Sequence, residues 1–140
     1  MHDPEHGDWV SFAECDHRQR AADNQRRIAA SAGQVHRAMA AVRERMPTGW
    51  HAAARQHIDG ATHTLEVEPA AGGIDAVAYL IPPTCGSRGW RVRVHNRTYR
   101  IDFPLYHDGG ARAASFDTAG DALDAAIRAL RVEIANTAHR

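Results

Sequence analysis

The stretch from Gly89 to Phe103, GWRVRVHNRTYRIDF, determines the fold expected for this chain. Apolar and polar residues alternate on both sides of the turn residues Asn96 and Arg97, which is typical of the two strands of a hairpin. A four-residue loop from His95 to Thr98 sorts the apolar residues into three pairs on one face: Val94 with Tyr99, Val92 with Ile101, and Trp90 with Phe103. A slip by one residue would destroy this sorting, so the register is expected to be well specified.

The opposite face of the expected hairpin carries arginine. The same pairing sets Arg93 against Arg100 and Arg91 against Asp102. Like charges directly opposite each other destabilise a sheet, and a bound anion would relieve the repulsion between Arg93 and Arg100. The alternative is an ordinary solvated face of an antiparallel sheet, in which Asp102 offsets Arg91.

A long helix is expected over residues 13–46, which contain no proline and one glycine. Apolar residues recur there in steps of four and three, and they form one stripe: Ile28, Ala32, Val35, Met39, Val42 and Met46. Pro47 ends the helix. We expect this helix to pack across the sheet, while pairing with a second copy of the chain, as a homodimer, is the alternative.

A second helix is expected after Thr118, which with Asp121 resembles a capping box. Its apolar stripe consists of Leu123, Ile127, Leu130 and Ile134, and it would cover the apolar face of the hairpin.

The remaining elements are shorter. Residues 62–68 alternate as a half-buried strand, and residues 74–81 form a more buried strand that Pro82 and Pro83 end. Trp50–Asp59 is expected to form a short helix, and Ala111–Phe116 an edge strand. The expected fold is therefore a single α+β domain over residues 1–140, in which residues 62–136 form an antiparallel sheet of four or five strands with a covering C-terminal helix.

Composition places the chain among ordinary globular proteins. Its 140 residues are 44% hydrophobic and 24% charged, which is enough for a core without disulfides or metal. The two cysteines, Cys15 and Cys85, lie in unrelated contexts, which favours a reducing compartment. The chain begins with a polar, acidic stretch and has no apolar window of membrane-spanning length. We expect a soluble cytoplasmic protein with no membrane contact.

Charge is distributed unevenly along the chain, although the formal net charge is zero. All seventeen basic residues are arginine, with seven against three acids in residues 15–46 and six against two acids in residues 85–116. Residues 1–14 contain four acids without arginine, and residues 62–81 contain three acids only. A balanced total therefore does not exclude an anionic partner.

The segment from about Gly89 to Glu133 resembles the DNA-binding domain of the APETALA and ethylene-response-factor family, a three-stranded sheet with a helix, and more distantly the arm-site-binding domains of phage integrases. The matching residues are Gly89-Trp90-Arg91-Val92-Arg93-Val94, Tyr99-Arg100, Phe103, Phe116-Asp117-Thr118, Ala122, Ala125 and Ala126. The resemblance implies that Arg91, Arg93 and Arg100 contact bases or phosphates in the major groove, and that Arg88 and Arg97 support them. Ala114 stands where this family commonly has glycine.

Signatures of catalysis and of metal binding are absent from the sequence. It contains no phosphate loop, no nucleophile-elbow serine and no metalloprotease helix. Ten histidines are present, yet none has zinc-finger spacing to a cysteine, and His51, His57 and His63 recur at a spacing that does not share one helix face. We expect no enzymatic activity, no metal and no cofactor.

The leading functional hypothesis is a small DNA-binding accessory protein or transcription regulator, such as one of a bacterium or a mobile element. It would bind double-stranded DNA through exposed arginines of the hairpin and its flanks: Arg88, Arg91, Arg93, Arg97, Arg100 and Arg112. The alternative is a protein-binding module, an inhibitor or adaptor of a larger partner. The segregated charges and the long helix favour this alternative, because the DNA-binding family does not need them.

Overall fold

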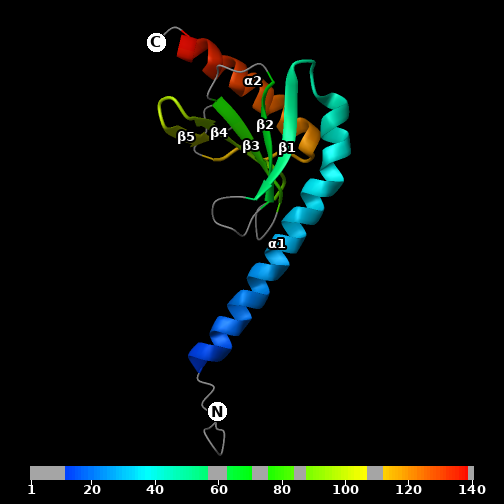
Figure 1. The fold of residues 1–140 in the computed structure, drawn as a ribbon, viewed down its shortest axis with the longest axis vertical. Helices are drawn as coiled ribbons and strands as arrows, with labels where there is room; N and C mark the ends of the chain where they lie inside the picture. Colours follow the sequence, from blue (N-terminus) through cyan, green and yellow to red (C-terminus); the bar gives the residue numbers. More distant parts are fainter. Residues whose placement is uncertain (1–11, 57–62, 71–75, 84–87, 107–111, 139–140) are drawn as a thin grey trace, which may run out of the picture.

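The computed structural model describes residues 12–56, 63–70, 76–83, 88–106 and 112–138. Two helices flank five strands along the chain (Figure 1). In chain order the elements are α1 (Phe12–Arg45), β1 (Trp50–Gln56), β2 (His63–Pro69), β3 (Ala76–Ile81), β4 (Arg91–Asn96), β5 (Ile101–Pro104) and α2 (Ala119–Ala138). The strands form one antiparallel sheet in the order β1-β2-β3-β4-β5, so the expected α+β fold is confirmed.

One face of the sheet is apolar and is covered by the helices. The register aligns Leu65 of β2 with Leu80 of β3, and Leu80 with Val92 of β4. These residues are fully or almost fully buried, because period-two alternation places them all on the same face. The core of the protein lies between this face and the two helices.

Helix α2 packs on the middle of the apolar face. Its buried residues include Leu123, Ala126, Ile127 and Leu130, which confirms the stripe expected from the sequence. The Oγ1 atom of Thr118 accepts a hydrogen bond from the backbone N–H of Asp121 (3.1 Å). This bond caps the helix, because it satisfies one of the amide groups that lack a partner at a helix N-terminus.

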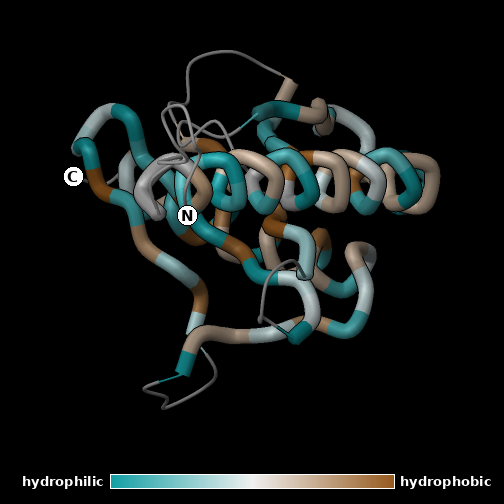
Figure 2. Tube along the Cα trace, turned by 90° about the horizontal axis from the view of Figure 1, so that it is seen from below, coloured by the Kyte–Doolittle hydropathy of each residue, from teal (hydrophilic) through white to brown (hydrophobic). Residues whose placement is uncertain are grey.

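Helix α1 has a packed half and a projecting half (Figure 1). Val35 and Val42 are buried against the sheet, and the backbone N–H of His63 donates to Ser31 Oγ (2.9 Å). The apolar stripe ends at Ile28 toward the N-terminus, and residues 15–22 are exposed. We call residues 12–27 the arm, and an α-helix of this length extends for about 24 Å. Hydrophilic and weakly hydrophobic residues alternate along α1 (Figure 2).

The first strand corrects the prediction for residues 50–59. Trp50–Gln56 is strand β1 and not a short helix, and the sheet therefore starts before residue 62. The sequence Ala52-Ala53-Ala54 favours a helix locally, but β1 pairs with β2 over its whole length. Tertiary pairing overrides local propensity here because seven residues gain cross-strand partners.

The register of the β4–β5 hairpin also differs from the prediction. Val94 pairs with Phe103 and Asn96 with Ile101, and residues 97–100 form the turn. The shift moves the pairing by an even number of residues, so Val94 and Phe103 stay on the apolar face. The expected pairs of Tyr99 with Val94 and Ile101 with Val92 are wrong, because Tyr99 lies in the turn and both side chains are exposed. Arg100 does not face Arg93, because it lies in the turn with a φ of 55°.

Asn96 explains this register. Its side chain is buried, and its Nδ2 atom donates to Glu133 Oε1 (2.8 Å) and to Thr137 Oγ1 (3.0 Å) of α2. Its Oδ1 atom accepts from the backbone N–H of Tyr99 (3.1 Å), which closes the turn. The left-handed conformation of Arg100 costs free energy, and these hydrogen bonds offset that cost.

The edge strand expected at residues 111–116 is replaced by isolated bridges. Phe116 pairs with Trp90, and Ala113 pairs with Tyr106. Trp90 is buried, as its sequence position predicted. Gly89, with a φ of 74°, allows this contact, because a Cβ atom there would lie 2.6 Å from the carbonyl oxygen of Phe116.

Several expectations concern residues outside the described part. These include Cys85 and His57. Among the described helices, none combines the length and the apolar composition that crossing a bilayer requires.

Candidate functional site

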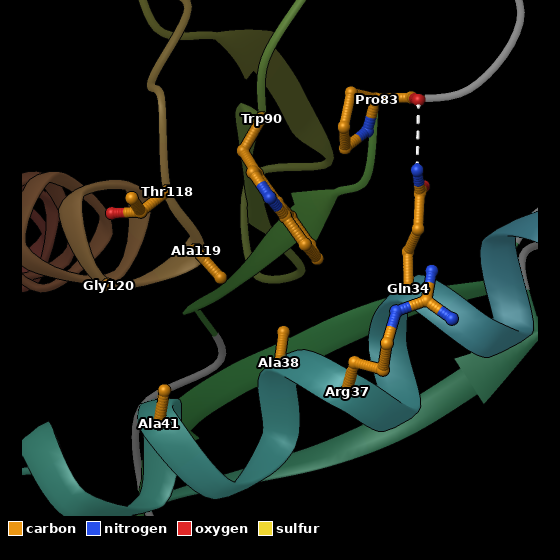
Figure 3. Close-up of a pocket in the computed structure, with 9 residues that line it drawn as sticks. All are labelled: Gln34, Arg37, Ala38, Ala41, Pro83, Trp90, Thr118, Ala119 and Gly120. Atoms are coloured by element: carbon orange, nitrogen blue, oxygen red, sulfur yellow. Dashed lines mark hydrogen bonds between the residues drawn. The ribbon is translucent and has the colours of Figure 1, made fainter.

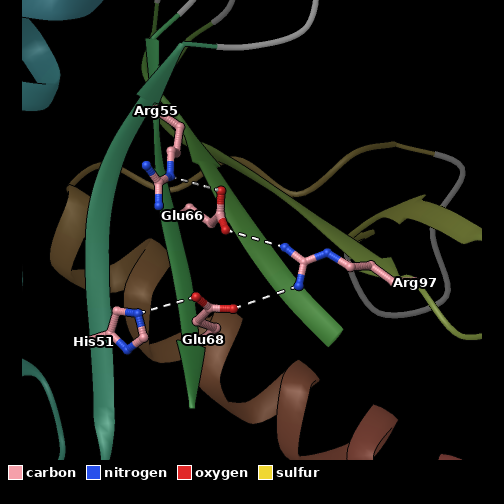
Figure 4. Close-up of polar contacts among 5 residues, drawn as sticks. All are labelled: His51, Arg55, Glu66, Glu68 and Arg97. Atoms are coloured by element: carbon pink, nitrogen blue, oxygen red, sulfur yellow. Dashed lines mark hydrogen bonds and ion pairs between the residues drawn. The ribbon is translucent and has the colours of Figure 1, made fainter. Parts of the chain in front are cut away.

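The open face of the sheet, opposite the helices, carries the charged residues of the strands. Glu66 and Glu68 of β2 lie at its centre (Figure 4). Arg97 reaches across β3 from the turn, with Nη2 3.4 Å from Glu66 Oε1 and Nη1 3.8 Å from Glu68 Oε2. On the other side, Arg55 Nε lies 3.6 Å from Glu66 Oε2, and His51 Nε2 lies 3.2 Å from Glu68 Oε1. We call these five residues the glutamate network.

A second ion pair occupies the β4–β5 side of this face. Arg93 donates from Nε to Asp102 Oδ1 (2.9 Å), and its Nη2 atom lies 2.8 Å from the same oxygen. His95 Nδ1 lies 3.7 Å from Asp102 Oδ2. The repulsion expected between Arg93 and Arg100 does not arise, because Arg100 lies in the turn and a carboxylate of the neighbouring strand pairs with Arg93.

Tyr79 of β3 lies between these two groups. Burial raises the pKa of its phenol above the ordinary value of 10.0, and the nearby carboxylate of Glu66 raises the pKa further. The positive charge of Arg97 and its hydrogen bond to the phenol act in the opposite direction and lower the pKa.

The six arginines expected to bind nucleic acid have different surroundings. Arg93 and Arg97 are paired with carboxylates of the open face. Arg88, Arg91, Arg100 and Arg112 are exposed, and within the described ranges no ion pair involves Arg91 or Arg100. The structure therefore gathers Arg93 and Arg97 around the protein's own acids. The expected ribbon, with Arg93 and Arg100 presented side by side, is not formed.

An apolar hollow lies between α1 and the outer strand β1. We call it the α1–β1 groove; it has a volume of about 440 Å³, and its apolar walls are Ala32, Val35, Met39, Ala40 and Ala54. Its remaining lining residues are His36, Arg43 and His63, so every titratable side chain in its wall is basic. Among the described residues, the buried Nδ1 atom of His63 has no hydrogen-bond partner.

A smaller hollow of about 300 Å³ lies between the two helices (Figure 3). Trp90 forms one wall, and the small residues Ala38, Ala41 and Gly120 leave the space open. Gln34 crosses one end, where its Nε2 atom donates to the carbonyl of Pro83 (3.2 Å). We interpret this hollow as a packing seam between α1 and α2, because Thr118 already caps the helix end that borders it.

In the part of the chain that the structure covers, no group of three or more His, Cys, Asp or Glu side chains could hold a metal ion. The surface features that sequence reasoning missed are the glutamate network and the α1–β1 groove. Both involve β1, and both were hidden by the prediction that residues 50–59 form a helix.

The fold and these surfaces define an α+β domain with a five-stranded antiparallel meander, a helix-covered face and an open charged face. Comparison with known protein families, with curated proteins and with solved structures gives no match for this chain. The resemblance of residues 89–133 to the APETALA and ethylene-response-factor domains stays a prediction. In the described residues of this segment the structure has two strands, isolated bridges and one helix.

Proposed function

We propose that this chain is a non-enzymatic protein-binding module that presents the arm of α1 to a larger partner. The observation that carries the proposal is the projection of the arm beyond the sheet (Figure 1). Short helices without tertiary contacts are only marginally stable in water, since most helix stability in proteins comes from packing. A partner that packs along the arm would supply that stability.

The charges of the arm favour protein over nucleic acid. Arg20 Nη2 lies 2.5 Å from Asp16 Oδ2, and Arg26 pairs with Asp23 one turn away. The arm is therefore an alternating surface of both signs and not a continuous basic track along which phosphates would bind. Ala21 and Ala22 lie exposed among these charges and would let a partner backbone approach closely.

A photo-crosslinking experiment tests this proposal. In this experiment, p-benzoylphenylalanine replaces Ala22 of the full chain, which is expressed in the cells that naturally produce the protein. A control chain carries the same residue in place of Val132, an exposed site on α2. The expected result is one protein adduct from position 22 that survives nuclease treatment and is absent from position 132. Nuclease-sensitive adducts, or no adduct at position 22, would contradict it.

Duplex DNA binding is the second candidate function, and Arg91 and Arg100 favour it because neither has a carboxylate partner among the described residues. Under this hypothesis the logarithm of the affinity falls steeply with the logarithm of the salt concentration. Arg91→Ala with Arg100→Ala would flatten this slope, as measured by fluorescence anisotropy with a duplex. Absence of binding at low salt would exclude this candidate.

A further inference from the structure

Strand β1 has backbone groups that face away from the sheet. The N–H of Ala70 donates to the carbonyl of Gly49 (2.7 Å), and these two residues continue the β1–β2 register. Hydrogen-bonded and non-hydrogen-bonded pairs alternate in an antiparallel ladder. Ala53 therefore directs its backbone groups toward β2, whereas Ala52 and Ala54 direct theirs outward. Because β1 is the last strand in the sheet order, no described strand lies on that side.

The two edges of the sheet are protected differently. Strand β5 has four residues and ends with Pro104, and Leu105 continues the pairing with β4 through its N–H, which donates to the carbonyl of Val92. The outer side of the chain is covered there, because Ala114 N–H donates to the carbonyl of Leu105 and Tyr106 bridges to Ala113. Short strands and proline are common devices that prevent pairing at an edge. Strand β1 has seven residues, an uninterrupted register and no proline. It is open to pairing with another strand.

The α1–β1 groove runs beside this open edge. Ala54 belongs to both, since its side chain lines the groove while its backbone groups face outward. An added strand would alternate its side chains, so every second one would point to the helix side of the sheet, where the groove lies. Apolar side chains fit its alanine, valine and methionine walls.

The basic side chains near the edge of β1 indicate what kind of partner segment would bind there. The titratable side chains of the groove are His36, Arg43 and His63, and no carboxylate lines it. On the open face, β1 carries His51 and Arg55, which already pair with Glu68 and Glu66, so the basic character of this edge comes from the groove side. A second copy of the chain would bring the same basic side chains of α1 against each other, which opposes self-pairing.

We propose that the edge of β1 binds an extended acidic segment of a partner protein as a sixth strand, and that the segment inserts apolar side chains into the α1–β1 groove. Backbone hydrogen bonds to Ala52 and Ala54 provide affinity, while the groove and its basic rim provide specificity. This site is separate from the arm, so it stands or falls independently of the function proposed for α1.

The test uses a short fluorescent peptide in which glutamate alternates with valine and leucine, and a counterpart in which lysine replaces glutamate. Fluorescence anisotropy with the full chain is expected to show saturable binding of the glutamate peptide and at least about tenfold weaker binding of the lysine peptide. Ala54→Pro removes the outward N–H of Ala54 without removing a β1–β2 hydrogen bond, and it is expected to weaken binding about tenfold. Ala54→Ser keeps that N–H and serves as the matched control.

A charge reversal keeps the proposal testable if Ala54→Pro fails to fold. Arg43 is exposed, and Arg43→Glu is expected to reduce the preference for the glutamate peptide over the lysine peptide by about tenfold. The proposal is overturned if the glutamate peptide does not bind, if both peptides bind equally, or if Ala54→Pro in its folded form binds like Ala54→Ser. A dimer in sedimentation velocity that Ala54→Pro dissociates would identify a second copy as the occupant and would also overturn it.

Discussion

The two faces of the sheet are built from the same strands but are stabilised differently. On the covered face, Leu65, Leu80 and Val92 are buried against two helices. On the open face, Glu66 and Glu68 interact with basic residues contributed by β1 and by the β4–β5 turn. Burial of apolar area stabilises the first face strongly, whereas partly exposed ion pairs contribute little.

We therefore expect the covered face to determine the stability of the fold and the open face to determine what the protein binds. Substitutions on the covered face should change the free energy of unfolding, because they remove buried contacts. Substitutions on the open face should leave folding nearly unchanged and alter what the surface attracts, because they release charges that neutralise each other.

The largest effect is expected from the centre of the covered face. Leu123→Ala removes a fully buried side chain of α2 and should lower the free energy of unfolding by about 2–5 kcal/mol. Urea denaturation followed by circular dichroism measures this change. Val132→Ala, at a position on the same helix that is 61% exposed, should change it by less than about 0.5 kcal/mol. Similar losses at both positions would contradict the assignment of the covered face.

A smaller loss is expected at Asn96, which joins the hairpin to α2. Asn96→Ala removes the donor to Glu133 and Thr137 and the acceptor for Tyr99, and it should cost about 1–3 kcal/mol. The same denaturation measurement applies, with the exposed Asn136→Ala as control. Equal stability of the two variants would show that Asn96 does not determine the turn.

Substitutions on the open face should change the binding of anions and leave the free energy of unfolding nearly unchanged. Neutralising its acids with Glu66→Gln, Glu68→Gln and Asp102→Asn should cost about 1 kcal/mol or less for each ion pair. The freed arginines, Arg55, Arg93 and Arg97, should then increase the salt concentration needed to elute the protein from heparin, because heparin is a polyanion.

A matched variant controls for total charge in that experiment. Asp117→Asn, Asp121→Asn and Asp124→Asn remove the same number of acidic charges near the start of α2. Among the described residues they free a single arginine, Arg45, which pairs with Asp121 and Asp124, and should therefore increase heparin retention less. Equal retention of both triple variants would mean that the position of the freed arginines on the open face has no role.

The smallest effect concerns the ionisation of Tyr79. Its pKa is raised in the folded protein, so the unfolded chain loses this proton first as the pH increases. The contribution of Tyr79 to the free energy of unfolding is therefore fully present below about pH 10. It is lost as the pH rises through the pKa that Tyr79 has in the folded protein. Tyr79→Phe should show a shallower loss of stability above about pH 10 in urea denaturation than the wild-type chain, and an unchanged slope would contradict this.

The spacing of apolar residues along the sequence was sufficient to predict several helices and strands. The stripe from Ile28 to Met46 predicted α1, the stripe from Leu123 to Ile134 predicted α2, and Thr118 was found at the start of α2 as its cap. The alternation in residues 62–68 predicted which side chains of β2 face the core. These features depend on residues within a few turns or strand positions of each other, so the printed sequence contains the whole signal.

Three other features depended on distant parts of the chain. Pairing with β2 made Trp50–Gln56 a strand despite its alanines, and hydrogen bonds from Asn96 to α2 moved the hairpin register. Glu66 and Glu68 paired with Arg97, about thirty positions away, and thereby neutralised a charge that the sequence suggested was available to nucleic acid. Cross-strand pairing and ion pairing depend on proximity in space, which local propensity does not encode.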